Sequence, residues 1–204
     1  MPGYQWDAEQ QAFLYPSGKQ VTRAQLDRIL DASINKVSAN MTALTQQLQD
    51  GTLKLYEWQV QMAAEMKMLH VGAAAMGNGG WANMTLADWG WVGQRVRTQY
   101  DYLKNFAHDI ASGDQPLDGR LLNRVALYAQ AGRGTQREIM RRVAQQRGAQ
   151  EERNILGAAE RHCPQCPSLS ALGWVLIGTL PAVGSRACLS RCHCHIETRG
   201  PNEV

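Results

Sequence analysis

The chain has few charged residues, few aromatic residues and no long apolar run. Of its 204 residues, 19% are charged and 7% are aromatic, whereas 44% are hydrophobic, as in ordinary globular domains. The low charge excludes a polyelectrolyte tail, and the hydrophobic share excludes disorder throughout the chain. The longest near-apolar stretch, residues 171–183, is shorter than the roughly 20 residues that a membrane-spanning helix needs. We therefore expect a folded protein that does not enter a membrane.

The motifs of common enzyme classes are missing as well. The sequence contains no Walker loop, no Gly-x-Ser-x-Gly, no His-Glu-x-x-His and no Rossmann glycine fingerprint. Its first seven residues have neither the basic nor the apolar stretch of a secretory signal. We expect a protein that is not an enzyme and that is made in a reducing cytoplasm. Thiols in that compartment bind metals more often than they form disulfides.

Cysteine is absent from the first 162 residues and frequent afterwards. All five cysteines lie between Cys163 and Cys194, in the order Cys-x2-Cys, twenty-one residues, Cys-x3-Cys-x-Cys. A Cys-x2-Cys turn lets two thiolates reach one ion, and a second group about twenty residues later supplies the other half of a tetrahedral zinc site. The spacing therefore predicts one structural zinc ion.

Five thiols are one more than a tetrahedral zinc ion needs. We expect Cys163, Cys166 and Cys188 as the first three ligands and either Cys192 or Cys194 as the fourth, because a strand through the last two would point both to one face. Disulfides, unpaired thiols and a redox or catalytic metal centre are the alternatives. A catalytic zinc keeps a coordination position open, so the richness in cysteine favours a closed site. The neighbouring histidines, at positions 162, 193 and 195, are then surface or supporting groups.

Apolar residues recur at helical spacing through most of the chain before the cysteines. Capping boxes begin at Thr22 and Thr135, and Thr85 marks another helix start. Glycine-containing breaks follow Asp50, precede Trp81 and span 132–134. The tight turn at Asp50 predicts an antiparallel hairpin. The predicted helices cover residues 22–50, 52–76, 85–112, 118–128 and 135–147, with one or two further turns within 150–161.

These patterns predict a mainly α fold in which a long helical hairpin and further helices carry a small zinc-stapled α+β module. Two short strands, within 173–178 and 192–198, are the only β structure that we expect, and they fall in the last forty residues. The predicted organisation is an extended N-terminal arm (1–20), a helical hairpin (21–76), a helical domain with an arginine-rich belt (81–160) and a cysteine-rich module (161–199).

The arginine-rich belt is a local excess of positive charge. Residues 120–161 contain nine arginines, no lysine and four glutamates, although the whole chain carries a net charge of only +3. We expect Arg137, Arg141, Arg142 and Arg147 on the exposed face of one helix. Such a face could contact the phosphates of DNA or an acidic partner, or it could simply be solvated.

Several C-terminal motifs, taken in order, resemble the minor head and head-morphogenesis proteins of tailed bacteriophages. The likeness covers residues 85–199. The segments that carry it are Tyr102–Gly113, Leu121–Gln130, His162–Cys166, Gly173-Trp174, Ile177–Pro181, Gly184-Ser185 and the cysteines of 188–194. Family members commonly have arginine between the last two cysteines, where this chain has His193.

This resemblance implies a non-enzymatic component of the virion, assembled in the host cytoplasm and bound to capsid or portal proteins. A homo-oligomer and a contact with DNA are compatible with that role. The alternative is a zinc-containing protein that binds nucleic acid through residues 120–161. A third class, a nuclease that uses the histidines around the metal, is the least favoured.

Overall fold

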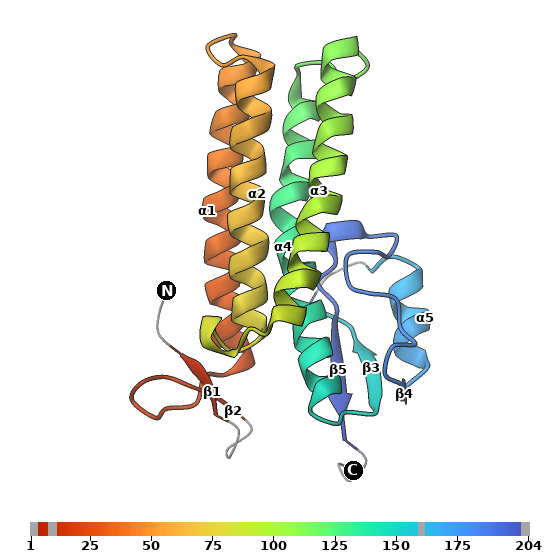
Figure 1. Cartoon of the computed structure of the whole chain (residues 1–204). Helices are drawn as coiled ribbons and strands as arrows, with labels where there is room; N and C mark the ends of the chain where they lie inside the picture. The colour runs from red at the N-terminus through yellow and green to blue at the C-terminus, as the bar shows by residue number, and fades with distance from the viewer. Residues whose placement is uncertain (1–3, 8–11, 159–161, 201–204) are drawn as a thin grey trace.

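In the computed structural model, which describes residues 4–7, 12–158 and 162–200, four long helices make up most of the protein. Helices α1 and α2 form one antiparallel hairpin, and α3 and α4 form a second hairpin beside it (Figure 1). A short 3-10 helix, η1 (Trp81–Asn83), lies in the connection between the hairpins. The bounds of the long helices are α1 Arg23–Gln49, α2 Leu55–Gly77, α3 Leu86–Ser112 and α4 Gly119–Gln146. None of the helices in the described part of the chain is long and apolar enough to span a membrane.

The helix ends follow the local capping signals at most positions. Thr22 caps α1 through the predicted capping box. Thr85 caps α3 at the predicted start, also through a complete capping box, and Gly113 ends α3 in the left-handed conformation with φ of 84°. Helix α2 begins three residues later than predicted. The backbone and hydroxyl of Thr52 both donate to the carboxylate of Asp50, at 3.1 and 2.6 Å, so that residue belongs to the turn.

Helix α4 is continuous, and the predicted break at 132–134 is wrong. Both glycines are positions of close approach within the helix. A Cβ on Gly132 would lie 2.8 Å from the side chain of Leu69, and one on Gly134 would lie 2.9 Å from the carbonyl oxygen of Val183. The predicted capping box at Thr135 is also wrong, because this residue is fully buried inside the helix.

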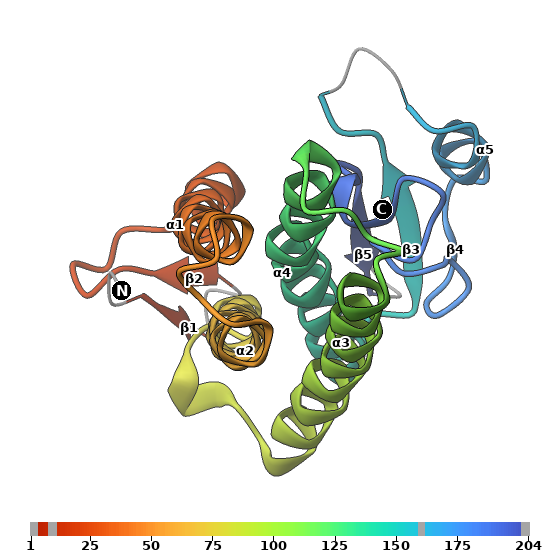
Figure 2. The ribbon, with the colours of Figure 1, turned by 90° about the horizontal axis from the view of Figure 1, so that it is seen from above.

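One hydrophobic core joins the two helical hairpins. The helically spaced apolar residues of α1 face this core, and α2 contributes Trp58, whose ring meets that of Phe106 edge-on at 5.4 Å. Phe106 also stacks on Tyr128 of α4. Seen from above, α4 lies between the first hairpin and the C-terminal sheet (Figure 2). Helix α4 is therefore the element that connects the bundle to the module.

The C-terminal module contains a three-stranded antiparallel sheet in the order β4-β3-β5. Strands β4 (Val175–Leu176) and β5 (His195–Arg199) confirm the two predicted strands, but both pair with β3 (Glu151–Ile155), where we had predicted helix. Burial alternates along β3, with Glu152 and Asn154 inside. The sheet therefore takes its middle strand from the predicted 81–160 domain. Helices α5 (Gln165–Ala171) and η2 (Leu189–Arg191) complete the module.

The described part of the predicted N-terminal arm forms a hairpin of β1 (Gln5–Asp7) and β2 (Ala12–Leu14). The expectation of β structure only in the last forty residues is therefore wrong. Tyr4 is buried in the helical core, and its ring meets that of Phe13 edge-on at 6.0 Å. These contacts attach the segment to its own bundle. Residues 1–3 and 8–11 of the predicted arm lie outside the described residues.

Candidate metal centre

Five cysteines from three short segments gather beside the sheet. Cys163 and Cys166 lie at the start of α5, and the backbone N–H of Cys166 donates to the carbonyl oxygen of Cys163 at 3.0 Å. Cys188 and Cys192 flank η2, and Cys194 directly precedes β5. Within the second turn, Leu189 adopts a positive φ of 48°, which is uncommon for a residue with a branched side chain. The turn thus brings the two cysteines of Cys-x3-Cys to the same side as the first pair.

The sulfur atoms form two groups that share Cys166, and within each group they lie within 4.8 Å of one another. The Sγ of Cys166 lies 3.3 Å from that of Cys163, 3.9 Å from that of Cys188 and 4.0 Å from that of Cys192. Four Zn–S bonds of about 2.3 Å in a tetrahedron place the sulfurs about 3.8 Å apart. The fifth thiol, of Cys194, lies within 4.8 Å of the sulfurs of Cys166 and Cys192. The cluster could therefore hold a metal ion such as zinc.

Arg186, which the sequence analysis did not single out, is fully buried beside the thiols. Its guanidinium donates to the side chain of Asn154 at 2.6 Å and to the carbonyl oxygen of Pro181, and it lies 4.0 Å from the Sγ of Cys166. Asn154 in turn donates to the carbonyl oxygen of Cys166 at 3.2 Å. A buried cation at this place favours thiolate over thiol. No motif in the sequence marked Arg186, because its role depends on the fold alone.

The thiols differ in their acidity. Burial raises the pKa of Cys188 to about 12 and raises that of Cys166 as well. Burial also opposes ionisation of Cys192, but hydrogen bonds from Cys188 and Cys194, together with the charge of Arg186, outweigh it and lower the pKa. Burial is likewise outweighed at Cys163, where hydrogen bonds from Cys166 lower the pKa to about 7. Part of the cluster is thus prepared to be anionic, as metal binding requires.

Among the described residues of the module, the thiols make up most of the buried apolar cluster, and Leu180 is buried apart from it. Its cluster of buried hydrophobic side chains consists of three cysteines and Val183, with Ile196 among the partly buried neighbours. One or two aliphatic side chains contribute only about 1.5–3 kcal/mol each on burial. Another source of stability is needed to hold the strands, α5 and η2 together.

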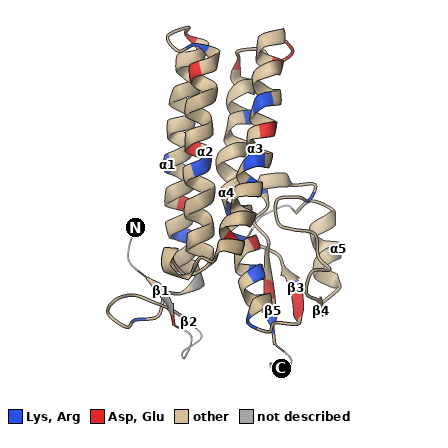
Figure 3. Ribbon diagram, in the orientation of Figure 1, with Lys and Arg blue, Asp and Glu red and all other residues tan. Residues whose placement is uncertain are grey.

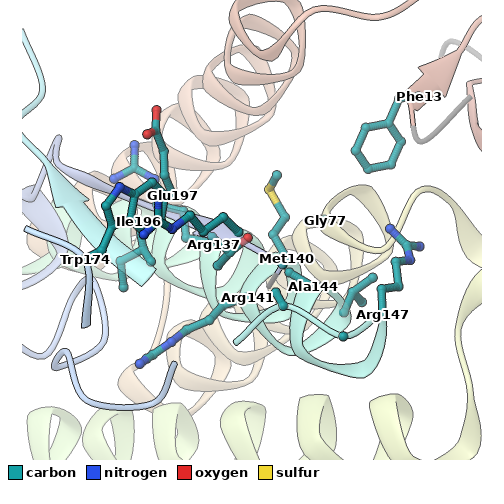
Figure 4. A pocket seen from close by; sticks show the side chains of 16 residues that line it. Phe13, Gly77, Arg137, Met140, Arg141, Ala144, Arg147, Trp174, Ile196 and Glu197 are labelled. Carbon is teal, nitrogen blue, oxygen red and sulfur yellow. The ribbon is translucent and has the colours of Figure 1, made fainter. Parts of the chain in front are cut away.

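The arginines of α4 do not form the exposed face that we expected. The guanidinium of Arg137 is buried and donates to the carbonyl oxygens of Cys192, His193 and Cys194. Figure 4 shows Arg137 in the pocket of about 520 Å³ between α4 and β5, with Phe13 on the other side. The arginine therefore holds the backbone of the cysteine-bearing segment against the bundle.

Arg141 is engaged inside the protein as well. Its Nε and Nη2 atoms each donate to the carboxylate of Glu152 at 2.6 Å, and Nη2 also donates to the carbonyl oxygen of Leu180 at 3.0 Å. The side chains of this ion pair are 10% and 0% exposed. The backbone N–H groups of Gly178 and Leu180 complete the shell around the carboxylate.

The other two arginines lie apart from each other. The guanidinium of Arg142 lies over the ring of Trp91 at 5.5 Å, whereas Arg147 is exposed at the end of α4. Arg141 and Arg147 point in opposite directions in Figure 4. Basic and acidic residues also lie close together where α4 meets the strands (Figure 3). The four arginines thus do not form one continuous basic surface, because the fold uses two of them internally.

No family model, no curated protein and no solved structure matches the chain.

Proposed function

We propose that Cys163, Cys166, Cys188 and Cys192 bind one structural zinc ion. The three edges of this set that meet at Cys166 measure 3.3, 3.9 and 4.0 Å, close to the edge of a ZnS₄ tetrahedron. The sulfur of Cys192 is grouped with those of Cys166 and Cys194, so zinc binding would draw it toward Cys163 and Cys188. Four thiolates form a closed site in which no position is left for a substrate. Cys194 is then the surplus thiol, with its Sγ 4.0 Å from Nδ1 of His162.

The observation that carries this proposal is that the cysteines themselves are most of the buried apolar cluster of the module. A zinc ion would replace the missing core by covalent links between α5, η2 and the start of β5. Zinc with four thiolates carries two net negative charges, and the buried guanidinium of Arg186 compensates part of that charge. The charge, the spacing and the scarcity of other core residues support the same assignment.

Metal content tests the assignment directly. Protein purified without a metal-binding tag should contain about one zinc ion per chain. Cys166→Ser should abolish zinc binding, whereas Cys194→Ser, with the same chemical change one residue before β5, should retain it. Zero zinc together with five cysteines that do not react with a thiol reagent would replace the zinc ion by cross-links, with at least one cysteine bonded to another chain.

We infer, further, that the chain is a structural or assembly component of a tailed-bacteriophage head, built in the host cytoplasm and bound to capsid or portal proteins. The resemblance of residues 85–199 to minor head proteins supports this role, and the closed ligand set supports a non-enzymatic one. We favour a protein partner over nucleic acid because Arg137 and Arg141 are already bound inside the fold.

An exposed apolar stripe on α2 supports a protein partner. Tyr56, Val60, Ala64 and Met68 follow at every fourth position, so they share one helical face. The three large side chains are 75%, 51% and 60% exposed. Contiguous apolar surface of this kind marks sites of protein contact.

Copurification tests the head assignment. The chain should be present at fixed stoichiometry in purified particles or in complexes with capsid or portal protein. Met68→Glu should abolish that association, whereas Gln61→Glu, an exposed change on the same helix outside the stripe, should leave it intact. Particles without the chain, or equal effects of the two variants, would overturn the assignment and leave the zinc proposal standing.

A further inference from the structure

A groove of about 600 Å³ lies between α3 and α4 and is separate from the cysteine cluster. It is bordered along its length by side chains of both helices, and the loop that precedes η2 closes one end through Gly184 and Ser185. The close approach at Gly134 allows this arrangement, because it lets that loop lie directly against α4. Concave sites of this volume are typical of small-molecule binding.

The charged residues that line the groove are both basic, namely Arg95 and Arg124. Arg124 is already paired with Asp109 at 2.7 Å. Arg95 forms no hydrogen bond or ion pair with any other described residue, and its Nε atom is shielded from solvent without a partner. Arg95 is half-buried, so its two Nη atoms keep contact with solvent, and only the Nε atom lacks both water and a partner. An anion in the groove would supply the acceptor that this N–H group lacks.

Two further donors along the same groove also lack partners. Gln99 is 7% exposed and Tyr128 is 8% exposed, and neither the amide of the first nor the hydroxyl of the second forms a hydrogen bond within the described residues. Burial raises the pKa of Tyr128 to about 12, so that its hydroxyl stays protonated and can donate. The polar atoms of both side chains keep contact with solvent, so they can donate to a ligand that enters the groove.

The remainder of the groove is suited to an apolar body. Leu127 and Ala131 of α4 and Leu189 of η2 line it, and the rings of Tyr102 and Tyr128 border it. One unpaired cation balances one negative charge, which fits a carboxylate better than a phosphate dianion. The planar guanidinium of an arginine also matches the two oxygens of a carboxylate.

We propose that the groove between α3 and α4 binds a small organic acid, whose carboxylate pairs with Arg95 and accepts hydrogen bonds from Gln99 and Tyr128 while its apolar body lies against Leu127. The proposed ligand is neither the zinc ion nor the head partner. Leu189 of η2 lies between two proposed zinc ligands, so the test uses the zinc-loaded chain.

Phenylacetate is a suitable probe, with phenylacetamide as its uncharged counterpart. Titration of the full zinc-loaded chain should shift the ¹⁵N resonance of the Arg95 Nε, together with backbone signals of Gln99 and Gly134. Arg95→Gln should weaken binding by at least about tenfold, the usual effect of losing a charge-assisted hydrogen bond. Arg97→Gln, an exposed change two residues away on the same helix, should leave binding unchanged.

Tyr128→Phe keeps the proposal testable if Arg95→Gln does not fold, because it removes one hydroxyl without changing the packing of the ring. It should weaken phenylacetate several-fold and leave the melting temperature nearly unchanged. Equal binding of phenylacetamide, equal loss in Arg97→Gln, or no shift at Arg95 would overturn the proposal. Tighter binding of inorganic phosphate, or of a capped Gly-Glu-Gly peptide, would replace the small acid by a phosphate or by a side chain of a partner.

Discussion

The buried ion pair between Arg141 and Glu152 should be among the most sensitive points of the fold. It joins the bundle to the middle strand of the sheet, and the carboxylate accepts four hydrogen bonds between 2.6 and 3.1 Å. Glu152→Gln keeps the shape of the side chain but removes its charge. Its amide NH₂ group would also face N–H donors of Arg141 or of the backbone, where the carboxylate accepts hydrogen bonds. Breaking a buried pair on one side costs about 3–5 kcal/mol, because the remaining charge is left uncompensated.

The same sheet contains a matched control. Arg153 and Glu197 form an ion pair at 2.8 Å whose side chains are 42% and 40% exposed. Exposed pairs contribute about 0–1 kcal/mol, so Glu197→Gln should change the stability little. The two substitutions are chemically identical, but only Glu152 is buried and accepts hydrogen bonds from backbone N–H groups.

Equilibrium unfolding in urea, followed by circular dichroism, measures the difference. With a slope of about 1–3 kcal/mol per molar urea, Glu152→Gln should lower the midpoint by at least about 1 M, whereas Glu197→Gln should leave it nearly unchanged. Adding Arg141→Met to Glu152→Gln should recover part of the loss, because the stranded cation is removed. Equal midpoints for the two single variants, or strictly additive effects in the double variant, would refute the reasoning.

Three further outcomes follow from other parts of the structure. Cys166→Ser, or removal of metal by a strong chelator, should abolish the hydrogen-exchange protection of the strands while the bundle stays protected, because zinc binding contributes about 10 kcal/mol or more. Cys194→Ser should leave the protection of the strands unchanged. Burial, and to a smaller extent the charge of Arg95, lowers the pKa of His70 from 6.5 to about 4. As the pH falls, His70 is therefore protonated in the unfolded chain before it is protonated in the folded protein. The folded protein should therefore lose about 2 kcal/mol between pH 7.5 and pH 5, a loss that is absent in His70→Gln and is read from urea unfolding at both values. Gly134→Ala should destabilise by about 1–3 kcal/mol in thermal unfolding because its Cβ meets a carbonyl oxygen, whereas Gly93→Ala, with open space around its Cβ, should stabilise by up to about 1 kcal/mol.

The sequence predicted the features whose signals are local. Thr22 and Thr85 predict helix starts, because the residues that cap a helix lie only three positions apart in the sequence. The cysteine spacing likewise predicted a cluster, since each half of it is a short turn. The apolar stripes of the hairpins were readable because helical periodicity accumulates over many residues.

The features that were missed depend on contacts between distant segments. Gly134 looks like a helix breaker, yet it lies inside α4 because the loop at Val183 needs its space. Residues 151–155 form a strand because β5, more than forty residues later, supplies the pairing and because Arg141 and Arg186 satisfy the buried Glu152 and Asn154. Propensity alone could not reveal either partner.

Arg137 places the cysteine-bearing backbone and the helical bundle in one energetic unit. Its guanidinium, on the helix that packs against both α1 and α2, holds the carbonyl oxygens of residues 192–194. If metal occupancy changes the position of that segment, the free energy of the bundle changes with it. A partner that binds the bundle could then change the affinity for zinc. Thermodynamic reciprocity requires that zinc changes the affinity for that partner by the same factor.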